Sequence, residues 1–365
     1  MKRRRLDPAV FALPVERLRA GYYSDAYFNY TKAVLEHDGV HPTVLMQVFQ
    51  KHPGAVLGGM DEAIAVLKLC AGRYAASSGG RRWLGGWDQL RVRALFDGDE
   101  VSAWETVLTI EGDYGLFAHL ETVYLGVLTR RTLVSTNVRR VVQAAGGKSI
   151  LFFPARFDHY RVQTGDGYAA HVAGAIGVFT DAQASWWGGK GIGTVPHGLI
   201  AACGGDTVEA ARRFADLYYP EVNVVALVDF TNDCVGTSLA CARALGERLW
   251  GVRLDTAETM VDRALWGRMG RFKPTGVAPE LVWEVRRALD AEGFEGVKIV
   301  VSGGFDAEKI RAFEAAGVPA DAYGVGSSLL RGNTDFTADV VMVDGRPCAK
   351  EGREYLPNPR LESVG

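Results

Sequence analysis

Short apolar runs alternate with amphipathic segments from about residue 126 to residue 340. The clearest runs cover residues 149–153, 224–229, 249–254, 298–301 and 322–325. Apolar runs of this length, bounded by polar and glycine residues, are typical of strands buried on both faces. Strands that alternate with helices pair in parallel. The pattern therefore predicts an α/β fold whose sheet closes, fully or partly, into a barrel.

Three of the intervening segments carry helix signals. Asp206 stands three residues before Glu209, the spacing of an N-cap with a capping box. Residues 279–289 place their apolar side chains on one helical face. Residues 306–316 do the same and end before Gly317, a favoured C-terminal cap residue. These segments are predicted helices between the strands.

The rest of the chain is organised differently. Residues 1–125 mix helical stretches with short strand-like runs, without regular alternation, which predicts an α+β domain. At the other end, Asp344-Gly345 lies between two apolar runs and predicts a β-hairpin. We therefore divide the chain into an α+β domain at 1–125, the barrel domain at 126–338 and a hairpin segment at 339–365.

Charge and composition exclude some classes of partner. The 365 residues include 41 Lys+Arg and 43 Asp+Glu, for a formal net charge of −2. This balance gives no general attraction to nucleic acid, and no apolar stretch approaches the roughly 20 residues that span a bilayer. The basic start MKRRRLDP predicts a solvated tail, since Asp7 and Pro8 stand where a signal peptide is apolar. We expect a cytoplasmic protein with no nucleic-acid or membrane partner.

Cysteine and glycine usage narrows the chemistry. The five cysteines are scattered without a C-x-x-C pair, which argues against a disulfide framework and a sulfur-ligated metal. Glycine is over-represented, with 44 residues in 365, about 12% against an average of about 7%. The chain has no low-complexity tract to absorb this excess, so the positions of the glycines matter.

Two glycine clusters follow predicted strands. They are Ser302-Gly303-Gly304-Phe305-Asp306 and Gly324-Val325-Gly326-Ser327-Ser328. Glycine pairs let backbone N–H groups approach an anion, and a helix N-terminus adds a favourable dipole. Either cluster alone could be a tight turn needed only for packing. Together, at consecutive strand ends of a barrel, they favour a phosphate site.

Polar residues gather at three further places in this half of the chain. The stretch Gly189-Lys190-Gly191-Ile192-Gly193-Thr194-Val195-Pro196-His197 is not a Walker A loop, because no Gly-Lys-Ser/Thr ends it. Asp229 and Asp255 each end a strand, where a carboxylate can hold a ribose hydroxyl or Mg²⁺, or make a structural ion pair. Several arginines could meet a carboxylate or pyrophosphate: Arg139, Arg140, Arg156 and Arg161.

Taken together, these motifs resemble the nicotinate phosphoribosyltransferase family, and its shorter archaeal-type members more than its long ones. The resemblance runs along nearly the whole chain. Its most specific pieces are Gly193-Thr-Val-Pro-His197, Leu227-Val-Asp229, Val252-Arg-Leu-Asp-Thr256, Val301-Ser-Gly-Gly304 and Tyr323-Gly-Val-Gly326.

The resemblance implies a fold and a reaction. The fold is that of the type II phosphoribosyltransferases, an irregular α/β barrel beside an α+β N-terminal domain that the C-terminal segment completes. The reaction joins nicotinate to phosphoribosyl pyrophosphate, giving nicotinate mononucleotide and pyrophosphate in NAD salvage. It is coupled to ATP, a co-substrate, through transient phosphorylation at the position of His197, and Mg²⁺ accompanies the pyrophosphate. Members form homodimers or higher homo-oligomers.

The same resemblance suggests roles for individual residues. His197, Asp229, Arg253 and Asp255 would carry the chemistry, with Asp229 and Asp255 also candidate ligands of Mg²⁺. Gly303, Gly304, Gly324 and Gly326 would hold the 5′-phosphate, and Tyr27 would stack on a pyridine ring in a partner's site. The remaining candidate substrate-binding residues are Arg139, Arg156, Lys190, Thr194, Ser302 and Ser327.

Some positions depart from the family pattern. Long members have Asp-Ser-Gly-Asp where this chain has Asp255-Thr-Ala-Glu258, and paired arginines where Ala155-Arg156-Phe157 leaves one. The carboxylate-recognising residues are therefore left open. Residues 351–365 contain no cysteine, so we expect no C-terminal zinc cluster.

Two alternative functions remain at this point. Quinolinate phosphoribosyltransferase shares the fold, but its Lys-Thr-Thr-Pro-Gly-Leu-Arg run is replaced here by FFPARFDHY at 152–160. A non-catalytic nucleotide-binding homologue is the other alternative, disfavoured because Asp229, Arg253, Asp255 and His197 are all intact.

Overall fold

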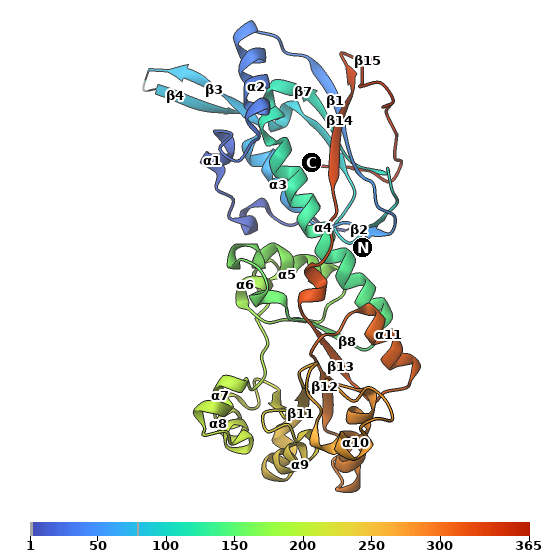
Figure 1. The fold of residues 1–365 in the computed structure, drawn as a ribbon. Coiled ribbons are helices and arrows are strands. Elements are labelled where there is room, and N and C mark those ends of the chain that lie inside the picture. The colour runs from blue at the N-terminus through green and yellow to red at the C-terminus, as the bar shows by residue number, and fades with distance from the viewer. Residues whose placement is uncertain (1–2, 79) are drawn as a thin grey trace. The chain divides into compact units, whose positions relative to one another are not determined.

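The computed structural model describes residues 3–78 and 80–365 and separates the chain into two compact units (Figure 1). Unit 1 comprises Met1–Thr136 and Gly332–Gly365, and unit 2 comprises Asn137–Arg331. The long helix α4 (Glu121–Ala144) supplies residues to both. Each unit is described in turn.

Unit 1 is built on a six-stranded antiparallel sheet in the order β15-β14-β1-β7-β5-β16. Its helices are α1 (Val15–Arg19), α2 (Ala26–Asp38), α3 (Met60–Cys70), η1 (Pro8–Phe11), η2 (Trp87–Gln89), η3 (Tyr114–Leu116) and η4 (Ala118–Leu120). Its strands are β1 (Thr43–Gln50), β2 (Ala55–Val56), β3 (Gly72–Ser77), β4 (Gly80–Gly85), β5 (Arg91–Ala94), β6 (Glu100–Val101), β7 (Thr106–Asp113), β14 (Phe336–Val343), β15 (Arg346–Pro347) and β16 (Glu362–Ser363).

The C-terminal segment completes this sheet. Strand β14 pairs antiparallel with β1 along seven residue pairs, and β16 pairs with β5 at the far edge. The turn Asp344-Gly345 joins β14 to β15, where Val343 faces Arg346. An α+β unit built from both ends of the chain is therefore what the fold class predicted.

One expectation for unit 1 is wrong. Arg3 and Arg5 are not part of a solvated tail: Arg3 forms an ion pair with Asp99, and Arg5 Nη1 lies 2.9 Å from Asp61 Oδ1. Both guanidinium groups also lie over the ring of Phe96. Paired carboxylates and an aromatic face hold these cations in place, and the composition of the first residues cannot reveal such distant partners.

Unit 2 is an α/β unit with a parallel sheet in the order β10-β11-β12-β13-β8-β9 (Figure 1). Its strands are β8 (Ser149–Phe152), β9 (Gly177–Val178), β10 (Val224–Leu227), β11 (Leu249–Leu254), β12 (Lys298–Val301) and β13 (Ala322–Val325). Its α-helices are α5 (Gln163–Val172), α6 (Asp181–Ala184), α7 (His197–Ala202), α8 (Thr207–Tyr218), α9 (Cys234–Leu245), α10 (Pro279–Ala291) and α11 (Ala307–Ala315). Short 3₁₀ helices are η5 (Pro154–Arg156), η6 (Tyr160–Val162), η7 (Ser185–Trp187), η8 (Gly246–Arg248), η9 (Arg263–Arg268) and η10 (Ser327–Leu330).

The predicted α/β alternation in this unit is confirmed. All five predicted runs are strands of the sheet, and it has open edges at β10 and β9, so it is a curled partial barrel. Asp206 caps α8 as expected by accepting a hydrogen bond from the Glu209 N–H, although the Glu209 side chain binds Arg213 and completes no capping box. Asp306, predicted only as the first helical residue, caps α11 by accepting from Glu308 and Lys309. Within the described residues no helix combines the length and apolar character needed to cross a bilayer.

One small apolar cluster fixes where the strand ends lie. Its buried members come from four different strands: Leu151, Val225, Val300 and Ala322. Phe153 and Phe179 pack against this cluster and remain partly accessible. Because parallel strands all end at the same edge of the sheet, the residues that follow them are brought together there.

Candidate functional site

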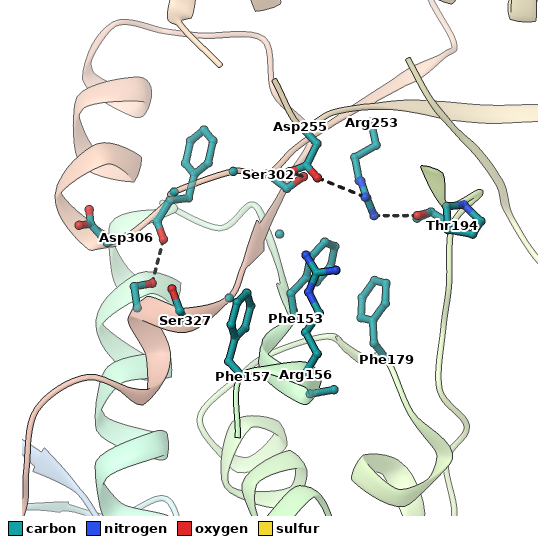
Figure 2. A pocket seen from close by; sticks show the side chains of 18 of the residues that line it. Phe153, Arg156, Phe157, Phe179, Thr194, Arg253, Asp255, Ser302, Asp306 and Ser327 are labelled. Atoms are coloured by element: carbon teal, nitrogen blue, oxygen red, sulfur yellow. Dashed lines mark hydrogen bonds and ion pairs between the residues drawn. The ribbon is translucent and has the colours of Figure 1, made fainter. Parts of the chain in front are cut away.

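A cavity of about 630 Å³ lies at the carboxyl ends of strands β8, β11, β12 and β13 in unit 2. This volume is in the usual range for a small-molecule site. Ten of the residues predicted from the sequence line it, and Figure 2 shows several of them: Arg156, Thr194, Arg253, Asp255, Ser302, Gly303, Gly304, Gly324, Gly326 and Ser327.

The glycine turns expose backbone on one wall of the cavity. Gly303 and Gly304 follow β12 with φ of +87° and +67°, a conformation that L side chains rarely adopt. A Cβ on Gly304 would lie 1.8 Å from Glu258 Oε1, and one on Gly324 would lie 2.6 Å from the ring of Phe153. Backbone conformation therefore favours glycine at 303 and 304, and the close ring of Phe153 favours it at 324.

A chain of polar contacts runs along the strand ends. Arg253 Nη1 donates to Thr194 Oγ1 at 2.8 Å, and Nη2 lies 3.5 Å from Asp255 Oδ2. Ser302 donates to Asp255 Oδ1 at 2.8 Å (Figure 2). Burial lowers the pKa of Arg253, while the carboxylates of Asp255 and Asp229 oppose that change. The network holds a cation and a carboxylate side by side at the cavity wall.

Aromatic rings make up another wall. The rings of Phe153 and Phe179 are 4.1 Å apart between centroids and inclined at 60°. Arg156 lies beside these rings in Figure 2, with its guanidinium carbon 5.5 Å from the centroid of Phe157. Flat apolar faces next to two arginines, Arg156 and Arg253, suit a planar aromatic ring that carries a carboxylate.

His197 and Asp229 form a pair beside the cavity. His197 begins α7 after Pro196, which does line the cavity, and its Nε2 is 3.0 Å from Asp229 Oδ1. The imidazole is half exposed, whereas the carboxylate is nearly buried. Burial raises the pKa of Asp229, His197 counteracts part of that rise, and negative Asp255 adds to it. The carboxylate thus holds one ring nitrogen and leaves Nδ1 for other partners.

Three predicted binding residues lie elsewhere. Within the described part of the chain, neither Arg139 nor Lys190 is among the residues that line the cavity. Arg139 Nη2 is 3.5 Å from the Val172 carbonyl oxygen, and Lys190 is exposed in the loop before α7. Tyr27 is an exposed residue of α2 in unit 1.

The cavity also contains residues that were not singled out from the sequence. They include Phe153, Phe157, Phe179, Glu258 and Arg331. Phe153 could have been found, because it is the last residue of the apolar run predicted at 149–153 and directly follows β8. Glu258 and Arg331 lie farther from their strands, in irregular segments whose path the sequence pattern does not give.

The donor set bears on metal binding. No group of three or more His, Cys, Asp or Glu side chains in the described ranges could hold a metal ion alone. The charge of Asp255 raises the pKa of nearby Asp229, and both carboxylates offer hard oxygen atoms. Mg²⁺ commonly takes one or two carboxylates and completes its shell with water and substrate phosphates. The residues present therefore fit a magnesium ion that arrives with a phosphorylated substrate.

Comparison with known proteins agrees with this architecture. The family model described as "Quinolinate phosphoribosyl transferase, N-terminal domain" matches residues 25–132. The chain is 30% identical over 268 residues to nicotinate phosphoribosyltransferase pncB1 of Mycobacterium tuberculosis, covering 71% of this chain and 55% of that protein. It thus spans about half the length of this curated relative.

Solved structures extend the likeness to nearly the whole chain. The nicotinate-nucleotide pyrophosphorylase of Pyrococcus furiosus is 32% identical with a TM-score of 0.77, over 96% of this chain and 84% of that one. Human nicotinic acid phosphoribosyltransferase shares the fold, with a TM-score of 0.64 and 16% identity over 89% of this chain and 76% of that one. On these grounds the chain belongs to the type II phosphoribosyltransferase family, which also contains these nicotinate phosphoribosyltransferase and nicotinate-nucleotide pyrophosphorylase relatives, and it has the fold of that family.

Proposed function

We propose that this protein transfers the phosphoribosyl group of phosphoribosyl pyrophosphate to nicotinate, releasing pyrophosphate and forming nicotinate mononucleotide. One observation carries the proposal. A single cavity combines exposed glycine backbone, a carboxylate network and an aromatic wall beside two arginines, represented by Gly304, Asp255, Phe153, Arg156 and Arg253. These features correspond to the phosphate, the ribose and the carboxylated ring of the two substrates.

The bond changes require charge stabilisation more than a protein nucleophile. The bond between ribose C1′ and a pyrophosphate oxygen breaks, with the electron pair leaving on that oxygen. The pyridine nitrogen of nicotinate then donates its lone pair to C1′. Asp255, held by Ser302, would orient the ribose beside the positive charge that develops on it. Arginine side chains, among them Arg253, would stabilise negative charge on the substrates in the partly buried cavity.

Mg²⁺ is part of the proposal as a partner of the pyrophosphate. Asp229 and Asp255 would hold it. When bound, the ion would neutralise charge on the leaving group. Before the ion binds, the hydrogen bond from His197 Nε2 keeps the Asp229 carboxylate oriented just after β10.

We further propose that His197 couples the reaction to ATP. With Nε2 paired to Asp229 at 3.0 Å, Nδ1 is the ring nitrogen left to attack the γ-phosphate of ATP. The phosphorus–oxygen bond to ADP would break as the phosphorus–nitrogen bond forms. Later hydrolysis of the phosphoimidazole would return the free histidine and inorganic phosphate. A homodimer in which Tyr27 completes a partner's site also belongs to this proposal.

A substrate panel tests the transfer. Purified protein with phosphoribosyl pyrophosphate, Mg²⁺ and nicotinate should release pyrophosphate, and quinolinate in place of nicotinate should release little. The family model for quinolinate phosphoribosyl transferase makes quinolinate the relevant competitor. Equal or faster turnover of quinolinate, with carbon dioxide evolved, contradicts the assignment to nicotinate.

A separate variant tests the ATP step. His197→Ala should lose nicotinate-stimulated ATP hydrolysis and retain some ATP-independent transfer, because His197 takes no part in the bond changes at C1′. His171→Ala is a matched control, since His171 is a partly buried histidine of the same unit that stacks on Trp187. Unchanged ATP hydrolysis in His197→Ala would remove this residue from the phosphate-carrier role.

A further inference from the structure

Lys309 reaches back from the first turn of α11 to the glycine turn that precedes the helix. Its Nζ donates to the carbonyl oxygen of Gly303 at 3.2 Å. The same ammonium lies 4.2 Å from the ring centroid of Phe305. Lys309 is partly buried, and this burial lowers its pKa. A lysine held by a carbonyl oxygen and an aromatic face has a defined position.

The position of Lys309 fixes the direction of one peptide group. In a trans peptide the carbonyl and the following N–H point in opposite directions. The carbonyl of Gly303 faces Lys309, so the N–H of Gly304 faces away from it. Gly303 and Gly304 line the 630 Å³ cavity, whereas Lys309 lines a second cavity of about 310 Å³. The N–H of Gly304 therefore points away from Lys309, and both glycines that flank this peptide line the substrate cavity.

The glycine turn needs such a restraint. Both glycines have positive φ and no side chain, so rotation of the peptide between them meets little steric resistance. The rotated form would turn the Gly303 carbonyl oxygen toward the substrate cavity and repel a phosphate. The negative groups around the turn, Glu258 and Asp306, do not correct this, because they cannot donate to a carbonyl.

We propose that Lys309 is a positioning residue that holds the Gly303–Gly304 peptide with its N–H toward the substrate cavity and thereby sets the affinity for a sugar phosphate. This inference rests on the proposed function, since it takes the glycine turn as the 5′-phosphate site. Lys309 touches the peptide and not the substrate. It should therefore affect binding of phosphoribosyl pyrophosphate far more than binding of nicotinate.

The experiment measures binding and turnover separately. Calorimetric titration with ribose 5-phosphate reports on the turn without requiring catalysis, and steady-state assays give the KM for each substrate. Lys309→Met should weaken ribose 5-phosphate binding about ten-fold or more, the effect of losing a hydrogen bond from a charged donor. The KM for phosphoribosyl pyrophosphate should rise by a similar factor, while the KM for nicotinate stays within about two-fold.

Lys273→Met is the matched control. Lys273 lines the same second cavity, and its charge acts on Lys309, yet no contact of Lys273 with the turn is found among the described residues. It removes a positive charge at a similar place without breaking the carbonyl contact, and should leave ribose 5-phosphate binding within about two-fold. Equal weakening by Lys273→Met would assign the effect to net charge and overturn the inference.

Chemical rescue separates positioning from a general loss of structure. Lys309→Ala lacks the atoms of a propylammonium ion, and the adjoining cavity gives that ion a route to the empty place. Added propylammonium should restore ribose 5-phosphate affinity, whereas tetramethylammonium, which has no N–H donor, should not.

Each remaining outcome is decisive. Unchanged ribose 5-phosphate affinity in Lys309→Met overturns the inference whatever the turnover shows. Failure of the wild-type protein to turn over nicotinate, while Lys309→Met still weakens ribose 5-phosphate binding, overturns only the substrate assignment. Failure of the wild-type protein to bind ribose 5-phosphate overturns both.

Discussion

Replacing Gly304 by alanine tests the most specific feature of the cavity, the exposed backbone of the first glycine turn. At φ of +67° an alanine pays a left-handed penalty of roughly 1–2 kcal/mol. Its Cβ would also lie 1.8 Å from Glu258 Oε1. That oxygen is the end of a flexible side chain, so it can move aside at small energetic expense, and we expect the stability loss to be mainly the conformational penalty.

Gly317 provides the matched control. It has φ of +63°, follows α11 in the same unit and has no atom within 4 Å of an added Cβ. Gly317→Ala should therefore lower the free energy of unfolding by the same roughly 1–2 kcal/mol, measured by urea denaturation. Only Gly304→Ala should weaken ribose 5-phosphate binding, because its methyl group blocks the approach to backbone N–H. We expect about ten-fold or more, the effect of one lost charged hydrogen bond.

A double variant identifies the cause of the binding loss. In Gly304→Ala with Glu258→Ala, the displaced carboxylate is gone while the methyl group remains. Recovery of affinity would assign the loss to the carboxylate pushed into the cavity, and persistence would assign it to the methyl group. Wild-type affinity in Gly304→Ala alone would refute the interpretation of this turn as a phosphate site. A stability loss far above that of Gly317→Ala would show that the Glu258 side chain does not move aside freely when Gly304 is replaced.

Three further predictions concern other parts of the molecule. Phe153→Leu should raise the KM for nicotinate about five-fold or more and leave that for phosphoribosyl pyrophosphate nearly unchanged, since only the flat ring face is lost; parallel rises in both values would contradict this. Thr194→Val keeps the side-chain volume and removes the oxygen that accepts a hydrogen bond from Arg253 at 2.8 Å. We expect kcat/KM to fall by roughly five- to ten-fold, the effect of losing about one hydrogen bond. A wild-type kcat/KM would show that this contact is dispensable. Burial lowers the pKa of His119 in unit 1 to about 3. Below pH 6.5 the unfolded chain therefore binds a proton at His119 that the folded chain does not bind, and the free energy of unfolding decreases as the pH falls. Between pH 7.5 and pH 5 the wild type should lose about 2 kcal/mol of unfolding free energy relative to His119→Gln in urea titrations, and parallel pH profiles would exclude this source.

Local sequence signals determined much of unit 2. The apolar runs became strands and Asp206 became the cap of α8, because strand burial and capping depend on residues within a few positions of each other. Because parallel strands end at one edge of a sheet, the same signals predict that the glycine turns, Asp255 and Ser302 meet at a common site, and all of them line the cavity.

Contacts between distant parts of the chain were decided only by the tertiary structure. The pairing of Arg3 and Arg5 with distant carboxylates, and the positions of Glu258 and Arg331 at the cavity, depend on segments without periodicity. The hydrogen bond from Lys309 to the Gly303 carbonyl depends on the direction of the lysine side chain, which the residue types alone do not determine. The sequence by itself therefore determined which strand ends carry polar and glycine residues, whereas folding determined which side chains meet there, because irregular loops take their path from the packing around them.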